Sequence, residues 1–469
     1  MATGYDLAFV DSIASSPTVR LNLHVGASGW SALADGTVFP PPQLERVGPQ
    51  SMLADGGLVA SAAYRNRVLT LALELDHDVD ADTSATQLQL LARELDRPAG
   101  NFLRYKPDTS APVFFRTFRS GFEAVDWDPI QRRATVSLLA EPFAYGLRET
   151  LSSVATLNNP VGGMTYDIAS PKGDVETPLY LDIDGTNGVT GRLQTGVAVC
   201  RRGTPSASPF ALQSEAMTMG TDTAIQANSA TMSGAGSNYV RTTPGTTSMV
   251  TRLSIAAFPT SPSTDARGTY RVFGRFKKNT AGDVWDVRLL WGSSTTQVTN
   301  DTVRTPASDA TIRYIDLGLV QIPAGYDPVT DGLSGVELPV QGVFLAVQAQ
   351  RVSGAGTLDT DVLLFMPADD RMMMVKLPAV QNTGTDSFIL EGGPRPAVYC
   401  LNLAGQLVTT QQSEITGTGP MLTPGRANRI YYVRDLGTTA SGGDSVTAST
   451  TLTPYYFPRY LAPLRPAAS

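Results

Sequence analysis

The sequence predicts a mainly β protein with one helix, built from more than one domain. Charged residues make up 17% of the 469 residues, below the usual quarter, so the polar surface must come largely from Thr, Ser, Gln and Asn. The 43 glycines and 32 prolines supply frequent turns. Between these turns, short apolar runs alternate with period two, as half-buried strands do. The length suggests about three domains.

The clearest strand lies between residues 64 and 75. Leu69, Leu71, Leu73 and Leu75 fall on one face, and the residues between them are small or polar. Because side chains alternate across a strand, the pattern predicts a strand that buries its leucine face.

One helix is predicted directly after this strand. Ser84 is the expected N-cap, with Gln87 three residues later as in a capping box. Pro98 is expected to end the helix. The stripe facing the sheet is expected to consist of the leucines at helical spacing, Leu88, Leu91 and Leu95.

The first domain is expected to close near residue 150. Strands are predicted at 113–118 and 132–139, and a proline-aromatic exit follows at 141–146. In the second of these strands, Thr135, Ser137 and Leu139 share one face. Residues 151–176 are rich in Ser, Asn, Gly and Pro and have little periodicity, so they are interpreted as a linker.

From residue 177 onward, the pattern is typical of a β-sandwich or jelly roll. Short period-two runs are separated by clusters of Gly, Asn, Asp, Ser and Pro. The runs fall at 179–183, 197–200, 270–276, 284–290, 312–319, 344–350, 360–365, 372–377, 388–390, 397–401, 429–433 and 451–460.

Composition argues against several functional classes. The formal net charge is −7 and no Lys/Arg-rich run stands out, so nucleic-acid binding is not expected. No apolar run approaches about 18 residues, so no membrane span is expected. The first ten residues lack the basic and apolar parts of a secretory signal. Cys200 and Cys400 are therefore expected to be reduced thiols rather than a disulfide or part of a zinc site.

Motifs for catalysis, cofactors and metals are largely missing. The only histidines are His24 and His77, and the sequence contains no nucleophile elbow and no phosphate-binding loop. The alternating aspartates of 76–82 lack the Gly and Glu of a calcium loop, so they are interpreted as a solvated turn before the helix. We expect no catalytic residue, no cofactor and no metal. Paired glycosidase carboxylates stay open, because they are separated in sequence. The candidates are Asp316, Asp359 and Asp361, each interpreted as a solvated residue at a strand edge or turn.

Aromatic side chains of the later region are the candidate glycan contacts. Exposed rings stack on sugar faces, although large apolar side chains are usually buried, so core packing is the first expectation. The candidates are Trp285, Trp291 and Tyr314, with Phe344 in the same region.

Several short patterns together resemble the distal tail proteins of phages. In the first 150 residues they are ADGG at 54–57, YRNRVLTL at 64–71, the capped helix, and the exit AEPFAY at 140–145. The run GTGPMLTPGRANRI at 417–430 is similar to a turn near the end of that family's second, galectin-like domain, where Pro424-Gly425 and Asn428 set the turn. The ending YYFPRYL at 455–461 is similar to tail proteins of actinobacterial phages.

The resemblance implies a domain plan. Residues 1–150 are expected to form a ring-forming belt domain with a β-sandwich-like fold and one helix, and 151–176 a linker. Residues 177–204 together with 371–469 are expected to form a galectin-like domain, with 205–370 inserted as a jelly roll similar to carbohydrate-binding modules. In an alternative partition, 177–435 form a single enlarged sandwich.

The resemblance also implies a function of assembly without turnover. Copies would pack head to tail into a ring, a hexamer in that family, at the tail tip of the virion after assembly in the host cytoplasm. Expected partners are the tail tube, other tail-tip proteins, and host cell-surface glycan for the outer domain. The alternatives are a peripheral carbohydrate-binding minor tail protein and, less favoured, a glycan hydrolase.

Overall fold

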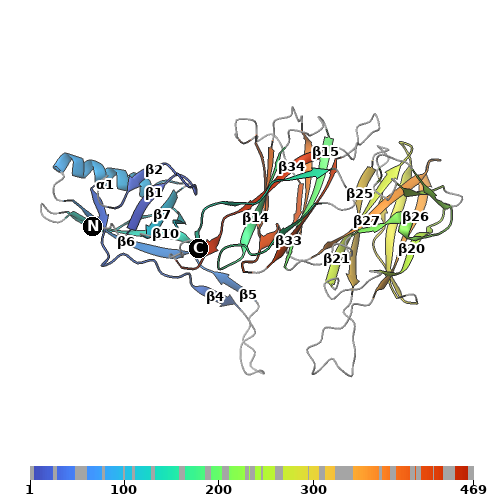
Figure 1. The fold of residues 1–469 in the computed structure, drawn as a ribbon, viewed down its shortest axis with the longest axis horizontal. Coiled ribbons are helices and arrows are strands. Elements are labelled where there is room, and N and C mark those ends of the chain that lie inside the picture. Colours follow the sequence, from blue (N-terminus) through green and yellow to red (C-terminus); the bar gives the residue numbers. More distant parts are fainter. Residues whose placement is uncertain are drawn as a thin grey trace, which may run out of the picture. The chain divides into compact units, whose positions relative to one another are not determined.

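The chain folds into two compact units in a computed structural model (Figure 1). Unit 1 consists of Met1–Glu149, Lys172–Thr177 and Tyr456–Ser469, and unit 2 of Thr150–Pro171 and Pro178–Tyr455. The structure describes residues 5–24, 29–47, 61–76, 80–98, 101–107, 111–127, 132–157, 164–184, 192–202, 211–227, 232, 238–243, 247–258, 268–293, 295–305, 312–322, 342–368, 372–380, 387–401, 407, 414–425, 427–436 and 449–462. Within these residues the chain is mainly β with one α-helix, which confirms the predicted fold class.

Unit 1 is built on one antiparallel sheet, which has nine strands among the described residues. Its main path runs β2-β1-β7-β8-β10-β6-β3, and β9 and β35 each pair with β10. The strands are β1 (Tyr5–Val10), β2 (Val19–Asn22), β3 (Trp30–Ala32), β6 (Arg67–Leu75), β7 (Asn101–Pro107), β8 (Val113–Thr117), β9 (Gly121–Trp127), β10 (Arg132–Tyr145) and β35 (Arg459–Tyr460). A separate two-stranded ribbon joins β4 (Leu44–Val47) to β5 (Ser61–Tyr64).

The predicted period-two strand forms the centre of this unit. Along β6, the four leucines are buried and the alternate residues are not. Leu71 lies opposite Val136 of β10, so the buried faces of the two strands line one core. This arrangement confirms the sequence reading of the strand and of its buried face.

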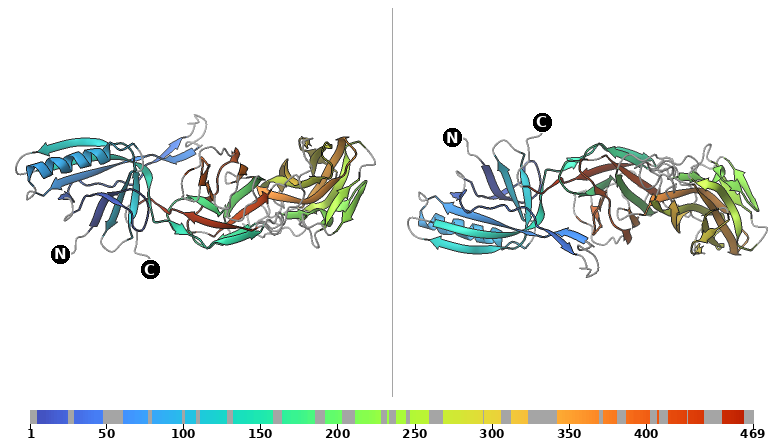
Figure 2. Two further views of the ribbon diagram at one scale, coloured as in Figure 1. Left: turned by 90° about the horizontal axis from the view of Figure 1, so that it is seen from above. Right: turned by 90° about the horizontal axis from the view of Figure 1, so that it is seen from below.

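The helix lies alongside this sheet and begins earlier than predicted (Figure 2). It is α1 (Ala81–Leu95), and its N-cap is Asp80, whose Oδ1 accepts a hydrogen bond from the Thr83 backbone N–H at 2.8 Å. Ser84, the predicted cap, lies inside the first turn and is buried, and its hydroxyl donates to the Asp80 carbonyl. Leu91 and Leu95 are buried in the core as predicted, and Leu88 is partly buried against it.

Two sheets of unit 2 contain strands from both ends of its sequence. One runs β11-β34-β14-β29-β30, with β12 paired to β34 and β32 to β14, and the other runs β13-β33-β15-β28-β31. Their strands are β11 (Glu149–Thr150), β12 (Val154–Leu157), β13 (Met164–Ile168), β14 (Thr177–Asp184), β15 (Arg192–Arg202), β28 (Met372–Val380), β29 (Ser387–Glu391), β30 (Ala397–Leu401), β31 (Glu414–Gly417), β32 (Met421–Leu422), β33 (Asn428–Leu436) and β34 (Ser449–Tyr456).

The segment interpreted as a linker takes part in these sheets. Within 151–176, β12 pairs with β34 and β13 pairs with β33. The segment therefore contains two short strands, VATL of β12 and MTYDI of β13, whose partners lie near the C-terminal end of the sequence. The predicted domain boundaries, the linker included, stay predictions.

The predicted turn before β33 forms as expected. Gly425 has a φ of +65°, which favours glycine. The Asn428 side chain closes the turn: its Oδ1 accepts from the Thr423 N–H and its Nδ2 donates to the Thr423 carbonyl, both at 2.9 Å. Of the two cysteines, Cys400 is buried on β30. Cys200 lies on β15, and its side chain is outside the described residues, so the absence of a disulfide stays a prediction.

The strands of residues 211–367 form a β-sandwich. One sheet runs β18-β19-β27-β21-β25 with β16 paired to β27, and the other runs β17-β20-β26-β22-β23 with β24 paired to β22. Both line one hydrophobic core, which includes Val272 and Phe365 from the first sheet and Val287 and Val347 from the second. The elements are β16 (Ala211–Gln213), the 3₁₀-helix η2 (Ser214–Ala216), β17 (Thr218–Met219), β18 (Thr223–Gln226), β19 (Tyr239–Thr242), β20 (Val250–Phe258), β21 (Gly268–Lys278), β22 (Val284–Gly292), β23 (Gln297–Thr299), β24 (Val303–Arg304), β25 (Ile312–Ile322), β26 (Val343–Ser353) and β27 (Leu358–Pro367).

Two hairpin turns of this sandwich are locked together by one carboxylate. Asp283, in the turn before β22, is buried, and its Oδ1 accepts the Ala355 backbone N–H at 3.0 Å. Ala355 lies between Gly354 and Gly356 in the turn before β27. A Cβ on Gly354 would lie 1.7 Å from Asp283 Oδ1, and a Cβ on Gly356 1.9 Å from Oδ2. Only glycine therefore allows the two turns to approach this closely.

Candidate functional site

The aromatic candidates for glycan contact differ in their exposure. Trp285 on β22 is fully buried in the sandwich core, so its ring presents no face to a sugar. Trp291 and Tyr314 are partly buried and pack against the same core. For Trp285 the structure favours the core role that large apolar side chains usually have. The glycan role of Trp291 and Tyr314 stays a prediction.

Trp291 is held in a fixed orientation by a hydrogen-bonded asparagine. Its Nε1 donates to Asn300 Oδ1 at 3.0 Å. The Asn300 amide in turn donates to the carbonyls of Leu317 at 2.7 Å and Leu319 at 3.0 Å on β25. The indole is therefore fixed between β22 and β25, and a fixed ring loses little conformational freedom when it stacks on a ligand.

The candidate acid Asp359 is a buried ion-pair partner. It lies within β27 opposite Arg241 of β19, and the guanidinium contacts both its oxygens, at 2.8 and 2.9 Å. The hydrogen bond from Arg241 to Asp359 raises the pKa of the arginine, and Arg241 also donates to the Tyr239 hydroxyl at 2.9 Å. Such a two-point pair fixes planar geometry across two strands.

The other two acids also have arginine partners. Asp361, on β27 as well, is buried against the buried Arg275 of β21. Asp316 on β25 is about one-third exposed and pairs with Arg271 at 2.8 Å. The interpretation as solvated residues at a strand edge or turn was therefore wrong for Asp359 and Asp361, which are buried within β27. Asp316 is partly exposed on the edge strand β25, and all three acids pair with an arginine of a neighbouring strand. Ion-paired carboxylates suit cross-strand linkage better than proton transfer.

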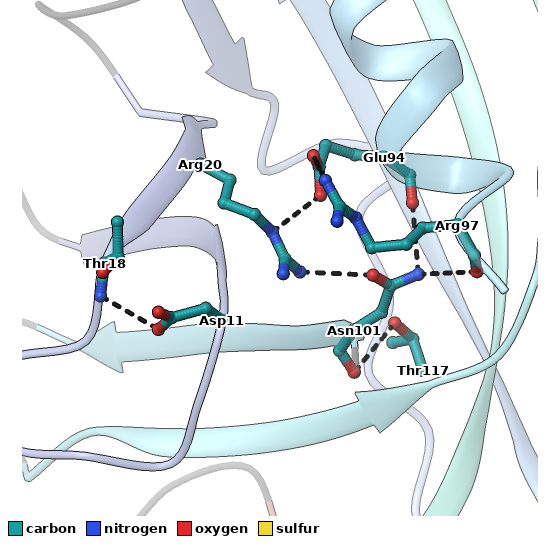
Figure 3. Close-up of polar contacts among 7 residues, drawn as sticks. All are labelled: Asp11, Thr18, Arg20, Glu94, Arg97, Asn101 and Thr117. Atoms are coloured by element: carbon teal, nitrogen blue, oxygen red, sulfur yellow. Dashed lines mark hydrogen bonds and ion pairs between the residues drawn. The ribbon is translucent and has the colours of Figure 1, made fainter. Parts of the chain in front are cut away.

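A polar network in unit 1 fastens the C-terminal end of the helix to the sheet (Figure 3). Arg20 on β2 contacts Glu94 of α1 at 2.9 Å and donates to Asn101 Oδ1 at 3.2 Å. The Asn101 amide on β7 donates to the carbonyls of Glu94 at 3.2 Å and Arg97 at 3.1 Å. Asn101 thus satisfies the Glu94 carbonyl, which the last helical turn leaves without a helical partner, and the Arg97 carbonyl just beyond the helix. The network therefore holds the end of the helix against β2 and β7.

Unit 1 also exposes a row of large apolar side chains, which we call the apolar row: Val38, Val68, Leu139 and Phe118. Val68 of β6 lies directly opposite Leu139 of β10, and Phe118 donates its backbone N–H to the Leu139 carbonyl at 2.8 Å. Val38 bridges to Thr70, two residues along β6. The four side chains are 40–52% exposed. Contiguous exposed apolar surface is characteristic of protein-binding sites, which makes the apolar row a candidate for one.

The sequence reasoning did not identify the apolar row, although one signal was present. Leu139 shares a strand face with Thr135 and Ser137, so its large apolar side chain stands on a polar face. Leu139 becomes part of an exposed apolar surface only because the folded sheet places Val68 and Phe118 beside it.

Metal and membrane sites are not found among the described residues. No group of three or more His, Cys, Asp or Glu side chains in these segments could hold a metal ion. No helix in the same segments is long and apolar enough to cross a membrane. His24 lies with its Nδ1 3.5 Å from Asp6 Oδ1, and His77 and Asp78 are outside the described residues.

Comparisons with known proteins leave the family open. No family model and no curated protein matches the chain. Among solved structures, the chain is similar to the SPP1 Dit (gp 19.1) protein, described as a hub adsorption apparatus of phages that infect Gram-positive hosts. The identity is 9%, the alignment covers 76% of this chain and 98% of that chain, and the TM-score is 0.25. It is also similar to chains of the phage P2 baseplate in its activated conformation, with Ca and with Sr. Both are 9% identical and cover 91% of this chain and 97% of the other, with TM-scores of 0.29 and 0.26. These scores do not establish a shared fold.

Proposed function

We propose that this protein is a non-enzymatic structural component of a phage tail tip, similar in role to distal tail proteins. In this proposal unit 1 joins identical copies into a closed ring, a hexamer as in the family it resembles. The ring connects the tail tube to the tip and to the receptor-binding apparatus of the virion. The sequence patterns at 54–57, 64–71, 140–145 and 417–430 support this role.

The apolar row of unit 1 is the observation that carries the proposal. Burying exposed apolar surface is the main favourable term in association, at about 25 cal/mol per Å². Six residues further along β6 and β10 from Val68 and Leu139 lies the charged Arg133–Glu74 pair, so the apolar side chains give way to polar ones in that direction. A ring requires such a surface to meet a different surface of the next copy.

The sandwich of residues 211–367 supports a second candidate function, that of a carbohydrate-binding minor tail protein outside the central ring. Its two sheets over one core have the architecture of many sugar-binding modules, although a fold alone does not imply a function. The oriented indole of Trp291 is the observation that favours sugar contact. A glycan hydrolase is less favoured, because all three candidate acids are paired with arginines.

The test of the proposed function is the oligomeric state of the full chain, measured by mass photometry and negative-stain electron microscopy. We expect closed rings. In the variant Val68→Ser/Leu139→Ser, the protein concentration needed for ring formation should rise at least tenfold, because two apolar contacts are lost. Val298→Ser, which changes an equally exposed valine of unit 2, is the matched control and should assemble normally. A full chain that stays monomeric, or rings unaffected by the double change, would contradict the proposal.

The second candidate function is tested separately. The full chain is incubated with host cell-wall polysaccharide, and both retention and reducing-sugar release are measured. If the full chain forms no rings but is retained by the polysaccharide, and Trp291→Ala reduces this retention, the carbohydrate-binding alternative is favoured.

A further inference from the structure

Unit 1 is completed by residues that follow all of unit 2 in the sequence. Residues 456–461, which we call the closing strap, return to unit 1 and add β35 to β10. Tyr460 lies opposite Ala144, and Arg459 opposite Tyr145. One residue beyond, the Gly146 N–H donates to the Pro458 carbonyl at 2.8 Å. The C-terminal end of β10 pairs with β8 along one edge, at Ala144 and Tyr145, and the strap is its partner along the other edge.

A second segment holds the strap from its other side. Lys172–Thr177 belongs to unit 1, although both its sequence neighbours belong to unit 2. The Asp174 N–H donates to the Arg459 carbonyl at 2.8 Å, and Asp174 Oδ2 accepts the Leu461 N–H at 3.0 Å. The Thr177 hydroxyl donates to the Phe457 carbonyl at 2.6 Å. The strap is thus bonded along its length by backbone and short side chains.

Side chains anchor the strap in the core of unit 1. Tyr460 is buried in the cluster that also holds the leucines of β6. The Arg459 guanidinium lies over the rings of Phe143, at 5.3 Å, and Tyr145, at 5.6 Å. Arg67, a buried residue of β6, donates to the Leu461 carbonyl at 3.3 Å. The cation–π contacts of Arg459 and the buried ring of Tyr460 therefore stabilise this short strand beyond its two paired residues.

The strap touches both strands that present the apolar row. On β10 it pairs at Ala144 and Tyr145, downstream of Leu139, and on β6 it bonds Arg67, the residue directly before Val68. We infer that the closing strap is required for self-association: the apolar row of unit 1 is ordered for association only after the strap has paired with β10 and bonded β6. The inference rests on the proposed function. Its consequence is an order of events, because the strap is synthesised only after unit 2.

The test compares two truncations of the full chain. Truncation after Tyr455 removes the strap, and truncation after Ala462 keeps it and serves as the matched control. A third variant, Arg459→Ala, weakens the strap without removing it. A synthetic peptide of residues 456–462 is added back to the strapless chain. Oligomeric state is read by mass photometry, and order by hydrogen exchange resolved over both units.

The strapless chain should stay monomeric while the Ala462 truncation assembles like the full chain. The amides of Gly146 and of the C-terminal end of β10 should exchange at least about tenfold faster without the strap, because this end loses the strand partner on one edge. The amides of unit 2 should keep their protection. Arg459→Ala should shift assembly in the same direction by a smaller factor, and the peptide should restore both readouts.

Three outcomes would overturn the inference, and they are distinguishable. If the full chain and the strapless chain assemble equally, the proposed function stands and the requirement for the strap is wrong. If the full chain itself stays monomeric, the proposed function fails and the requirement for the strap fails with it. Unchanged protection of Gly146 in the strapless chain also rejects the closure on β10.

Discussion

Replacing Leu91 by Ala tests the packing of α1, the one α-helix among the described residues, against the sheet of unit 1. Leu91 is fully buried in the core that also holds Leu95 and the leucines of β6. The change removes three carbon groups, which at about 0.8 kcal/mol each amounts to roughly 2.4 kcal/mol of lost transfer free energy. The cavity left behind adds to this loss, so we expect a destabilisation of unit 1 of about 2–5 kcal/mol.

The assay must resolve the two units, because a chain with several domains does not unfold in one two-state step. Hydrogen exchange against denaturant separates the helix and β6 from unit 2. Gln89→Ala is the matched control on the exposed side of α1, and its effect should stay within about 0.5 kcal/mol. A loss for Leu91→Ala as small as that of the control would refute the placement of the helix, and so would a loss that appears in unit 2.

Acid stability, thiol content and catalysis give three further expectations. The Arg304 guanidinium, bonded to Asp286 at 2.8 and 2.9 Å, lowers the pKa of that carboxyl from its ordinary value of 3.8. The stabilisation by this ion pair is therefore complete above about pH 3.8 and is lost as the pH falls through the depressed pKa. In Asp286→Asn, the unfolding free energy of unit 2 should depend less on pH in this acid range. Thiol titration of the denatured, unreduced protein should find two thiols per chain; none would indicate a Cys200–Cys400 disulfide. Incubation with cell-wall polysaccharide should release no reducing sugar; release abolished by Asp359→Asn would establish a hydrolase.

Sequence periodicity predicted β6, which buries one face, and missed β9, which does not. Along β6, alternation is visible because every second residue enters the core. Along β9, nearly every residue is exposed, so no period marks the strand. The helix was recognised by its leucine stripe, but its start was placed four residues late at Ser84. Several aspartates precede it, and the choice of Asp80 as cap depends on the local path of the chain.

The candidate acids show where reasoning from one sequence fails. The partner of Asp359 is 118 residues away and that of Asp361 is 86 residues away, so the local context gives no sign of either pair. Both acids were read as solvated, since charged residues are rarely buried without a partner. The pairing of the closing strap was also not predicted, because the strap lies far from β10 in the sequence. Its YYFPRYL pattern supported a family resemblance but did not indicate which strand it pairs with.

The contact of Asp283 with Gly354 and Gly356 has a consequence for sequence variation among relatives of this chain. The three positions are expected to vary as a set, because a Cβ at either glycine displaces the carboxylate that receives the Ala355 N–H. Gly354 also has a φ of +90° and should resist change alone. Gly356→Ala should cost less once Asp283 is shortened to Ala, although the Thr280 side chain, with its Cβ 2.9 Å from the added methyl, must still shift. In a saturation library, a smaller loss for that double change than the sum of the two single losses would reveal the coupling.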